Sequence, residues 1–201
     1  MNEGYTKFTV HLTEGDLPAN PELCRLNEVR TELHDLGLIG VLPGGVGYGN
    51  VSVRLNGSAR FIISGTATGA KRELAPTDYC LVDSFDVRRN EVFCTGRIQA
   101  SSESMSHGSV YQADPAITCV IHIHSRAIFR FMLDNGYLRT SEQAAYGTPE
   151  IAEETVRLVR DAGTVRGIFV MAGHEDGVIA YGDDIGPVRQ LLLDIHRKAE
   201  G

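Results

Sequence analysis

Hydrophobic and polar residues alternate over several short stretches of the chain, a pattern typical of β-strands with one buried face. Phe8, Val10 and Leu12 alternate with polar residues and indicate a short first strand. Asn56-Gly57 separates two further runs, and this dipeptide is a strong signal for a hairpin turn. The pattern predicts strands over these residues: 50–55, 59–64, 79–84, 91–94, 117–123, 167–172 and 177–181.

Five other segments are predicted as helices. The first has Asn20 as its cap and Pro21 at its first position, and Gly37 ends it. Its inner face is marked by Leu23, Leu26, Val29, Leu33 and Leu36. The other helices are expected from Ser101-Ser102 to Gln112, from His124 to about Leu133, from Thr148 to Gly163, and from Asp183 or Asp184 to the C-terminal region.

The predicted strands mostly follow one another in pairs and do not alternate strictly with helices. This order favours antiparallel pairing, because a short turn can join antiparallel strands whereas parallel strands need a long crossover. With about seven to nine strands and five helices, we expect an α/β fold, an α/β/α sandwich with a mainly antiparallel central sheet. No repeat or linker divides the sequence, so residues 1–201 are expected to form a single domain.

Composition and charge narrow the function. The 201 residues carry a net charge of −7 without a run of basic residues, which argues against nucleic-acid binding. No stretch reaches the roughly 18 apolar residues of a membrane helix, and the first ten residues lack a signal-peptide pattern. We therefore expect a cytoplasmic protein without a membrane partner. Its four cysteines form no C-x-x-C pair and are expected to be buried, inert thiols: Cys24, Cys80, Cys94 and Cys119.

Two histidines on one predicted strand are the first candidates for chemistry. His122 and His124 are two residues apart, so their side chains leave the same strand face and can bind one divalent ion. His174 lies in a glycine-rich turn and is a candidate third ligand, since a catalytic zinc has about three protein ligands. Glu103 begins a predicted helix and is either a functional carboxylate or an ordinary N-terminal charge. Histidines that only make hydrogen bonds are the alternative.

Three loops are candidates for binding a small anion through backbone N–H groups and hydroxyls, without help from net charge. The first is the glycine-rich stretch 43–50, which ends in Gly49-Asn50. The second is the hydroxyl-rich loop 64–69, which ends in Thr68-Gly69, and the third is Ser101-Ser102 at a helix start. Glycine-rich turns that serve only backbone geometry are the alternative. Together the loops suggest a bound phosphate or carboxylate.

In their order and spacing, these motifs resemble the class II aldolase and adducin head family, typified by L-fuculose-phosphate aldolase. The resemblance runs from about Glu22 to Arg197. The motifs that carry it are GNVSVR at 49–54, SSE at 101–103 with His107 one turn later, HIH at 122–124, YGT at 146–148, and a late histidine before GVIA at 177–180.

The resemblance implies a fold, a site and an activity. It implies Zn²⁺ or another divalent transition metal on His122, His124 and His174, with Glu103 as the catalytic base. It implies that the substrate phosphate is bound by Gly49, Asn50, Thr68, Gly69, Ser101 and Ser102, with residues 64–66 as an alternative to Thr68-Gly69. The implied activity is a zinc-dependent aldolase-like lyase, which cleaves or forms a C–C bond of a phosphorylated ketose through a metal-stabilised enediolate. Most family members are homotetramers with sites at subunit interfaces.

Several departures from the family pattern leave alternatives open. Glu175 and Asp176 stand between His174 and a glycine that usually follows directly, so either can contribute to the site. The acid is not assigned: Tyr137 and Tyr146 are candidates, and Tyr146 is expected to pack or cap. The family also contains pentulose-phosphate 4-epimerases, methylthioribulose-phosphate dehydratases and sugar-acid decarboxylases. A non-enzymatic adducin-like interaction module is the alternative from another class.

Overall fold

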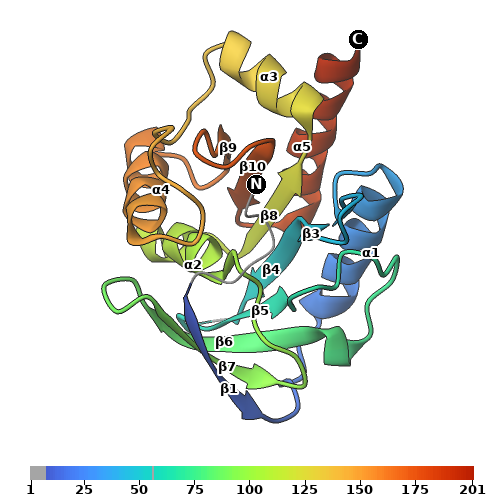
Figure 1. The fold of residues 1–201 in the computed structure, drawn as a ribbon, viewed down its shortest axis with the longest axis vertical. Coiled ribbons are helices and arrows are strands. Elements are labelled where there is room, and N and C mark those ends of the chain that lie inside the picture. The colour runs from blue at the N-terminus through green and yellow to red at the C-terminus, as the bar shows by residue number, and fades with distance from the viewer. Residues whose placement is uncertain (1–7, 56) are drawn as a thin grey trace.

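The computed structural model describes residues 8–55 and 57–201. Its main sheet contains eight strands: β1 (Thr9–Glu14), β4 (Asn50–Arg54), β5 (Phe61–Ser64), β6 (Tyr79–Asp86), β7 (Glu91–Gly96), β8 (Cys119–His124), β9 (Gly167–Val170) and β10 (Gly177–Gly182). In space their order is β1-β7-β6-β5-β4-β8-β10-β9 (Figure 1). Every neighbouring pair is antiparallel except β1 and β7. The predicted mainly antiparallel sheet is confirmed.

Helices cover both faces of this sheet. They are α1 (Glu22–Asp35), α2 (Ser104–Ala113), α3 (Arg126–Asp134), α4 (Pro149–Ala162) and α5 (Ile185–Glu200). One hydrophobic cluster lies between the sheet and α1, α3 and α5, and a second lies between the sheet and α2 and α4 (Figure 1). Alternate side chains of β8 belong to the two different clusters: Ile121 and Ile123 join the first, and Val120 joins the second. The α/β/α sandwich is thus confirmed.

Capping residues explain where the helices begin and end. Asn20 Oδ1 accepts a hydrogen bond from the Glu22 N–H at 2.9 Å, and α1 begins there, one residue later than predicted. The Asp184 carboxylate accepts from the Gly186 N–H at 2.8 Å and starts α5. Gly37 and Gly163 have φ of 71° and 61°, and each ends a helix by adopting the left-handed backbone that glycine permits.

The structure corrects the predicted inner face of α1. Leu36 is 42% exposed and follows the last helical turn, so it does not join the core. Arg30 takes a core position instead and is only 1% exposed. The prediction of four buried cysteines is also wrong for Cys24, which is exposed, while the other three are buried.

Short elements in glycine- and proline-rich segments were not predicted from the sequence. A two-stranded sheet pairs β2 (Gly40–Val41) with β3 (Gly47–Tyr48), and a 3₁₀ helix, η1, spans Pro76–Asp78. The hydrophobic pattern cannot find two-residue strands, because their alternation is too short to detect. The β2–β3 hairpin brings the glycine-rich stretch beside the hydroxyl-rich loop, since Gly47 and Gly69 are in contact.

Two predictions fall on residues outside the described part of the chain. Asn56 of the hairpin turn is one, although the flanking strands pair as expected, with Ser52 opposite Ile63. The other is the stretch before Phe8, on which the expected absence of a signal peptide depends. In residues 8–55 and 57–201, no helix has the length and apolar character needed to cross a membrane.

The central position of β8 makes its side chains critical for stability. Ile121 is fully buried, so Ile121→Ala is expected to lower the free energy of unfolding by about 2–5 kcal/mol through lost burial and a residual cavity. Leu138 is 44% exposed and supplies the control. Leu138→Ala is expected to change the free energy of unfolding by less than about 0.5 kcal/mol. Urea unfolding followed by circular dichroism measures both. Equal losses in the two variants would contradict this packing.

Candidate metal centre

β8 presents two imidazoles on one face of the sheet. His122 lies between Asn50 of β4 and Ile179 of β10, and His124 lies opposite Gly177 of β10. Because Val120 of the same strand faces α2 and α4, the i+2 and i+4 positions also face that side. The two histidines therefore point towards the layer that contains the N-terminus of α2.

A tight turn between β9 and β10 brings in the third imidazole. The His174 N–H donates to Met171 O at 2.8 Å, and the Gly177 N–H donates to His174 O at 2.9 Å. A Cβ on Gly177 would lie only 2.7 Å from His174 Cδ2 and 3.3 Å from His122 Cε1. Glycine at 177 thus allows the rings of His122 and His174 to stack, with centroids 5.4 Å apart.

The three histidines converge on one point. His124 Nε2 lies 3.1 Å from His122 Nε2 and 3.0 Å from His174 Nε2. Three nitrogens of a tetrahedral zinc site, each about 2.0–2.1 Å from the ion, are about 3.3 Å apart. Among the described residues, these histidines form the one group of three or more potential ligands close enough to hold a metal ion. The donor set fits a divalent transition metal, with two of the three spacings near the tetrahedral value and all ligand atoms within 4.8 Å of one another.

Glu103 places a carboxylate beside this cluster. It is the N-cap residue of α2 and is 3% exposed. Its Oε2 accepts a hydrogen bond from Ser106 Oγ at 2.8 Å, and its Oε1 lies 3.7 Å from His174 Nε2. One carboxylate oxygen is therefore held by its own helix while the other faces the imidazoles.

The predicted site residues come together around one cavity of about 160 Å³. Its lining includes every residue predicted for metal, base or substrate: Gly49, Asn50, Thr68, Gly69, Ser101, Ser102, Glu103, His122, His124 and His174. Gly65 and Thr66 of the alternative loop segment also line it. Asn50 Nδ2 donates to Ser101 Oγ at 3.0 Å and links two of the three loops. The roles of these residues remain predictions.

Two tyrosines, Tyr48 and Tyr146, also line this cavity. The ring of Tyr146 lies against His174, with centroids 4.5 Å apart, so it packs as expected but also lines the cavity. The ring of Tyr48 lies 5.6 Å from that of His124, and its hydroxyl donates to Gly37 O. Tyr146 was visible in the YGT motif, whereas Tyr48, between two glycines, gave no signal in the sequence.

Other candidates lie elsewhere. Glu175 forms an exposed ion pair with Arg126 at 3.0 Å, and Asp176 lies 3.7 Å from the same guanidinium. Neither carboxylate belongs to the metal-binding group. Tyr137 packs near Phe131 and is absent from the residues that line the cavity.

Burial keeps the imidazoles of β8 neutral. Desolvation, and then the neighbouring rings of His124 and His174, hold the pKa of His122 well below its ordinary value. Burial also lowers the pKa of His124 to about 4. Neutral imidazole is the form that binds a metal ion, so both side chains are ready ligands at pH 7.

His107 lies behind the site in a buried polar network. Ser52 Oγ is 2.7 Å from His107 Nδ1 and 2.7 Å from the Tyr111 hydroxyl. His107 is fully buried, and burial lowers its pKa to about 3. This arrangement ties the middle of α2 to β4 and agrees with the supporting role expected for His107.

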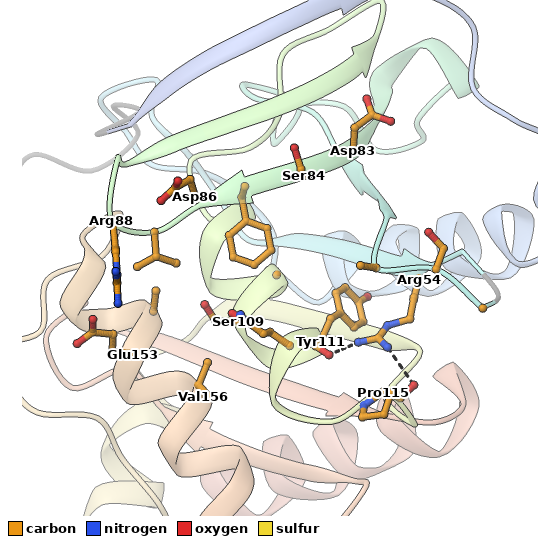
Figure 2. Close-up of a pocket in the computed structure, with 18 residues that line it drawn as sticks. Arg54, Asp83, Ser84, Asp86, Arg88, Ser109, Tyr111, Pro115, Glu153 and Val156 are labelled. Carbon is orange, nitrogen blue, oxygen red and sulfur yellow. Dashed lines mark hydrogen bonds between the residues drawn. The ribbon is translucent and has the colours of Figure 1, made fainter.

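A second, larger cavity of about 920 Å³ lies between the C-terminal half of α2, α4 and the β6–β7 hairpin (Figure 2). Its lining includes Ser109, Tyr111 and Glu153, and none of the residues predicted for catalysis or for binding. The chemistry foreseen from the sequence is therefore concentrated in the smaller cavity.

Fold and site together define an α/β sandwich in which three histidines that could hold a metal ion lie next to a buried glutamate. The model of the family described as "Class II Aldolase and Adducin N-terminal domain" matches residues 40–200. The chain belongs to this family, as the sequence motifs predicted. No curated protein matches the chain.

Solved structures support the fold. L-fuculose-1-phosphate aldolase from Thermus thermophilus is 22% identical, with a TM-score of 0.61 over 88% of this chain and 90% of that one. A sugar-phosphate aldolase from Thermotoga maritima is 15% identical, with a TM-score of 0.64 over 88% and 90%. YgbL from Klebsiella pneumoniae, a putative aldolase/epimerase/decarboxylase, is 17% identical, with a TM-score of 0.63 over 88% and 85%. At these identities the likeness shows the fold alone.

The lowered pKa of His107 predicts a pH dependence of stability. The folded pKa is about 3 and the unfolded one about 6.5, so below pH 6.5 only the unfolded state takes up the proton. This contribution to stability is complete above pH 6.5 and is lost as the pH falls. His107→Gln is expected to reduce the fall in unfolding free energy between pH 6.5 and 5 by about 2 kcal/mol. Urea titrations of the metal-free wild-type and His107→Gln proteins at several pH values measure this difference. If the unfolding free energies of both proteins changed identically with pH, the burial of a neutral His107 would be contradicted.

Proposed function

We propose that this protein is a zinc-dependent lyase of the class II aldolase type, which cleaves or forms a C–C bond of a phosphorylated ketose. The observation that carries the proposal is the convergence of three imidazole Nε2 atoms beside the Glu103 carboxylate, in a cavity walled by hydroxyl and backbone N–H groups. Membership of the class II aldolase and adducin family supports an enzyme of this kind.

His122, His124 and His174 are proposed to hold the ion, with zinc favoured by three neutral imidazole donors. Bound there, a divalent ion supplies Lewis-acid chemistry: it polarises the substrate carbonyl and stabilises the charge that develops on that oxygen. Three protein ligands leave room for substrate oxygens, which is the arrangement of a catalytic site and differs from a closed structural one.

Glu103 is proposed to move the proton. Ser106 holds Oε2, so Oε1 is the oxygen that removes a proton from the substrate carbon next to the carbonyl, or returns it. The carboxylate is 3% exposed, which excludes bulk water from the transfer. Tyr146, whose ring lies against His174, is a candidate acid from within the same chain.

The substrate phosphate is proposed to lie where the three loops meet. Ser101 and Ser102 precede α2, and the dipole at the N-terminus of this helix favours an anion. Thr68 Oγ1 donates to Gly65 O at 2.9 Å, so this loop is expected to act through its backbone N–H groups. Turning the Asn50 amide so that its oxygen accepts from Ser101 would direct its N–H groups to the phosphate.

Other reactions of the family use a similar centre. Epimerase, dehydratase and decarboxylase activities are the alternatives, and one structural neighbour is itself described as a putative aldolase/epimerase/decarboxylase. A non-enzymatic adducin-like module is disfavoured, because burying the imidazoles of His122 and His174 beside the Glu103 carboxylate costs free energy without any benefit to a scaffold. We further propose a cytoplasmic homotetramer with sites at subunit interfaces, which sedimentation analysis tests.

The metal assignment predicts the effect of removing one ligand. His174→Ala is expected to weaken zinc binding by at least about 100-fold, since even residues that only orient a ligand contribute 10–100-fold. His11→Ala is the matched control, because His11 lies in β1, where it stacks on Phe93, and its loss should leave the affinity unchanged. Competition with a chromophoric chelator measures both. Unchanged affinity in His174→Ala would mean that the third ligand lies elsewhere.

The base assignment predicts a selective loss of proton transfer. Glu103→Gln is expected to keep its zinc and to lose exchange of the hydroxymethyl protons of dihydroxyacetone phosphate with D₂O by about 10²–10⁴-fold. Glu175→Gln changes an exposed carboxylate and should exchange like the wild type. Proton NMR follows the reaction without knowledge of the aldehyde.

Two outcomes would contradict different parts of this account. Full exchange by zinc-loaded Glu103→Gln would remove Glu103 from the role of base. No exchange by zinc-loaded wild-type protein would exclude the ketose-phosphate aldolase and favour the dehydratase, decarboxylase or epimerase reactions.

A further inference from the structure

Arg30 occupies an unusual place beneath the loop that follows β5. It lies in the middle of α1 and is 1% exposed. Its guanidinium donates to four main-chain carbonyl groups, which belong to Thr68, Gly69, Lys71 and Arg72. The distance is 3.0 Å to Thr68 O and 2.7 Å to Arg72 O.

Within the described chain, no carboxylate forms an ion pair with Arg30. Asp78, which lies near this loop, is paired instead with Lys71, whose Nζ is 2.6 Å from Asp78 Oδ1. A buried cation without a carboxylate is costly unless dipoles compensate it. The four carbonyl dipoles are that compensation, and their number fits the five donors of a guanidinium.

These hydrogen bonds fix the direction of the loop's peptide groups. No cis peptide occurs in the described chain, so the N–H of each residue points away from the preceding carbonyl. Because Thr68 O and Gly69 O face Arg30, the N–H groups of Gly69 and Ala70 point to the opposite side. In the described part of the chain, neither N–H donates a hydrogen bond.

Close packing against the β2–β3 hairpin also holds the loop. A Cβ on Gly69 would lie 2.1 Å from Gly40 O and 3.1 Å from Gly47 Cα, so the backbone of the β2–β3 hairpin touches this residue directly. Thr68 and Gly69 also line the cavity with the three histidines. The loop is therefore held between Arg30 and the hairpin at the edge of the cavity.

We propose that Arg30 is a positioning residue for anion binding, which holds the carbonyl groups of Thr68, Gly69, Lys71 and Arg72 on one side so that the Gly69 N–H faces a phosphate. The role rests on the phosphate site proposed above. Arg30 does not touch the phosphate. Its contribution is to fix the donors before the anion arrives, which removes the cost of ordering them on binding, and to place a positive charge behind them.

The structure contains a matched control for this role. Arg54, which is only partly buried, also donates from its guanidinium to main-chain carbonyls, those of Tyr111 and Pro115 (Figure 2) and that of Asp114. It lines the larger cavity and is absent from the lining of the metal centre. Loss of Arg54 therefore removes hydrogen bonds of the same kind as loss of Arg30, but away from the proposed phosphate loop.

The test measures binding of inorganic phosphate to zinc-loaded wild-type, Arg30→Gln, Arg30→Lys and Arg54→Gln proteins by ¹⁵N–¹H NMR titration. Thermal melting and zinc affinity are measured alongside. Arg30→Gln is expected to weaken phosphate binding at least about tenfold and to lose the shift of the Gly69 amide signal, with zinc affinity unchanged. Arg54→Gln is expected to lower the melting temperature similarly while binding phosphate within about twofold of the wild type.

Arg30→Lys keeps the charge and covers the case in which Arg30→Gln fails to fold. A lysine ammonium cannot span four carbonyls, so phosphate binding is expected to be weaker than in the wild type. Wild-type affinity in the folded Arg30 variants, or an equal loss in Arg54→Gln, would overturn the role of Arg30 alone. Failure of the wild-type protein to bind phosphate would instead remove the proposed phosphate site.

Discussion

The site depends on bringing His124 Nε2 within about 3 Å of the Nε2 atoms of both His122 and His174, beside a buried carboxylate. Such a cluster is costly without a shared ligand, because nitrogen lone pairs then face each other in a desolvated space. The register of the sheet makes the cluster possible: β8 lies between β4 and β10, and the turn before β10 carries His174. A shift of β8 by one residue would move His122 and His124 to the opposite face.

In the same cavity, the proposed anion site relies on backbone and hydroxyl donors, whereas the proposed metal site relies on imidazoles. The chain carries a net charge of −7, and among the described residues no lysine or arginine lines the cavity. The donors proposed for a phosphate are backbone N–H groups of the loops, the start of α2 and the hydroxyls of Ser101 and Ser102, all of which line this cavity. Arg30 is proposed to support these donors from behind. It binds carbonyl groups on one side of the loop, so the N–H groups of the same peptides point to the other side. In the proposed function, a phosphorylated substrate would meet fixed dipoles at one end and the three histidines at the other.

Much of the fold followed from hydrophobic periodicity and capping signals, and the site followed from the motifs and the resemblance that they carry. All ten predicted site residues line one cavity, although their roles await experiment. Periodicity failed where tertiary contacts decide burial: Leu36 lies past the last turn of α1, and Arg30 is buried because a distant loop supplies its acceptors. Tyr48 could not be found from the sequence, because the β2–β3 hairpin that places it is too short to leave a pattern.

The central claim is that His122, His124 and His174 together bind one zinc ion with a position left open for substrate. X-ray absorption at the zinc edge of stoichiometrically loaded protein tests it most directly, because it counts ligands by element and distance. The account predicts three imidazole nitrogens at about 2.0–2.1 Å and further oxygen ligands, without sulfur. A sulfur shell at about 2.3 Å, or fewer than three imidazoles, would contradict it.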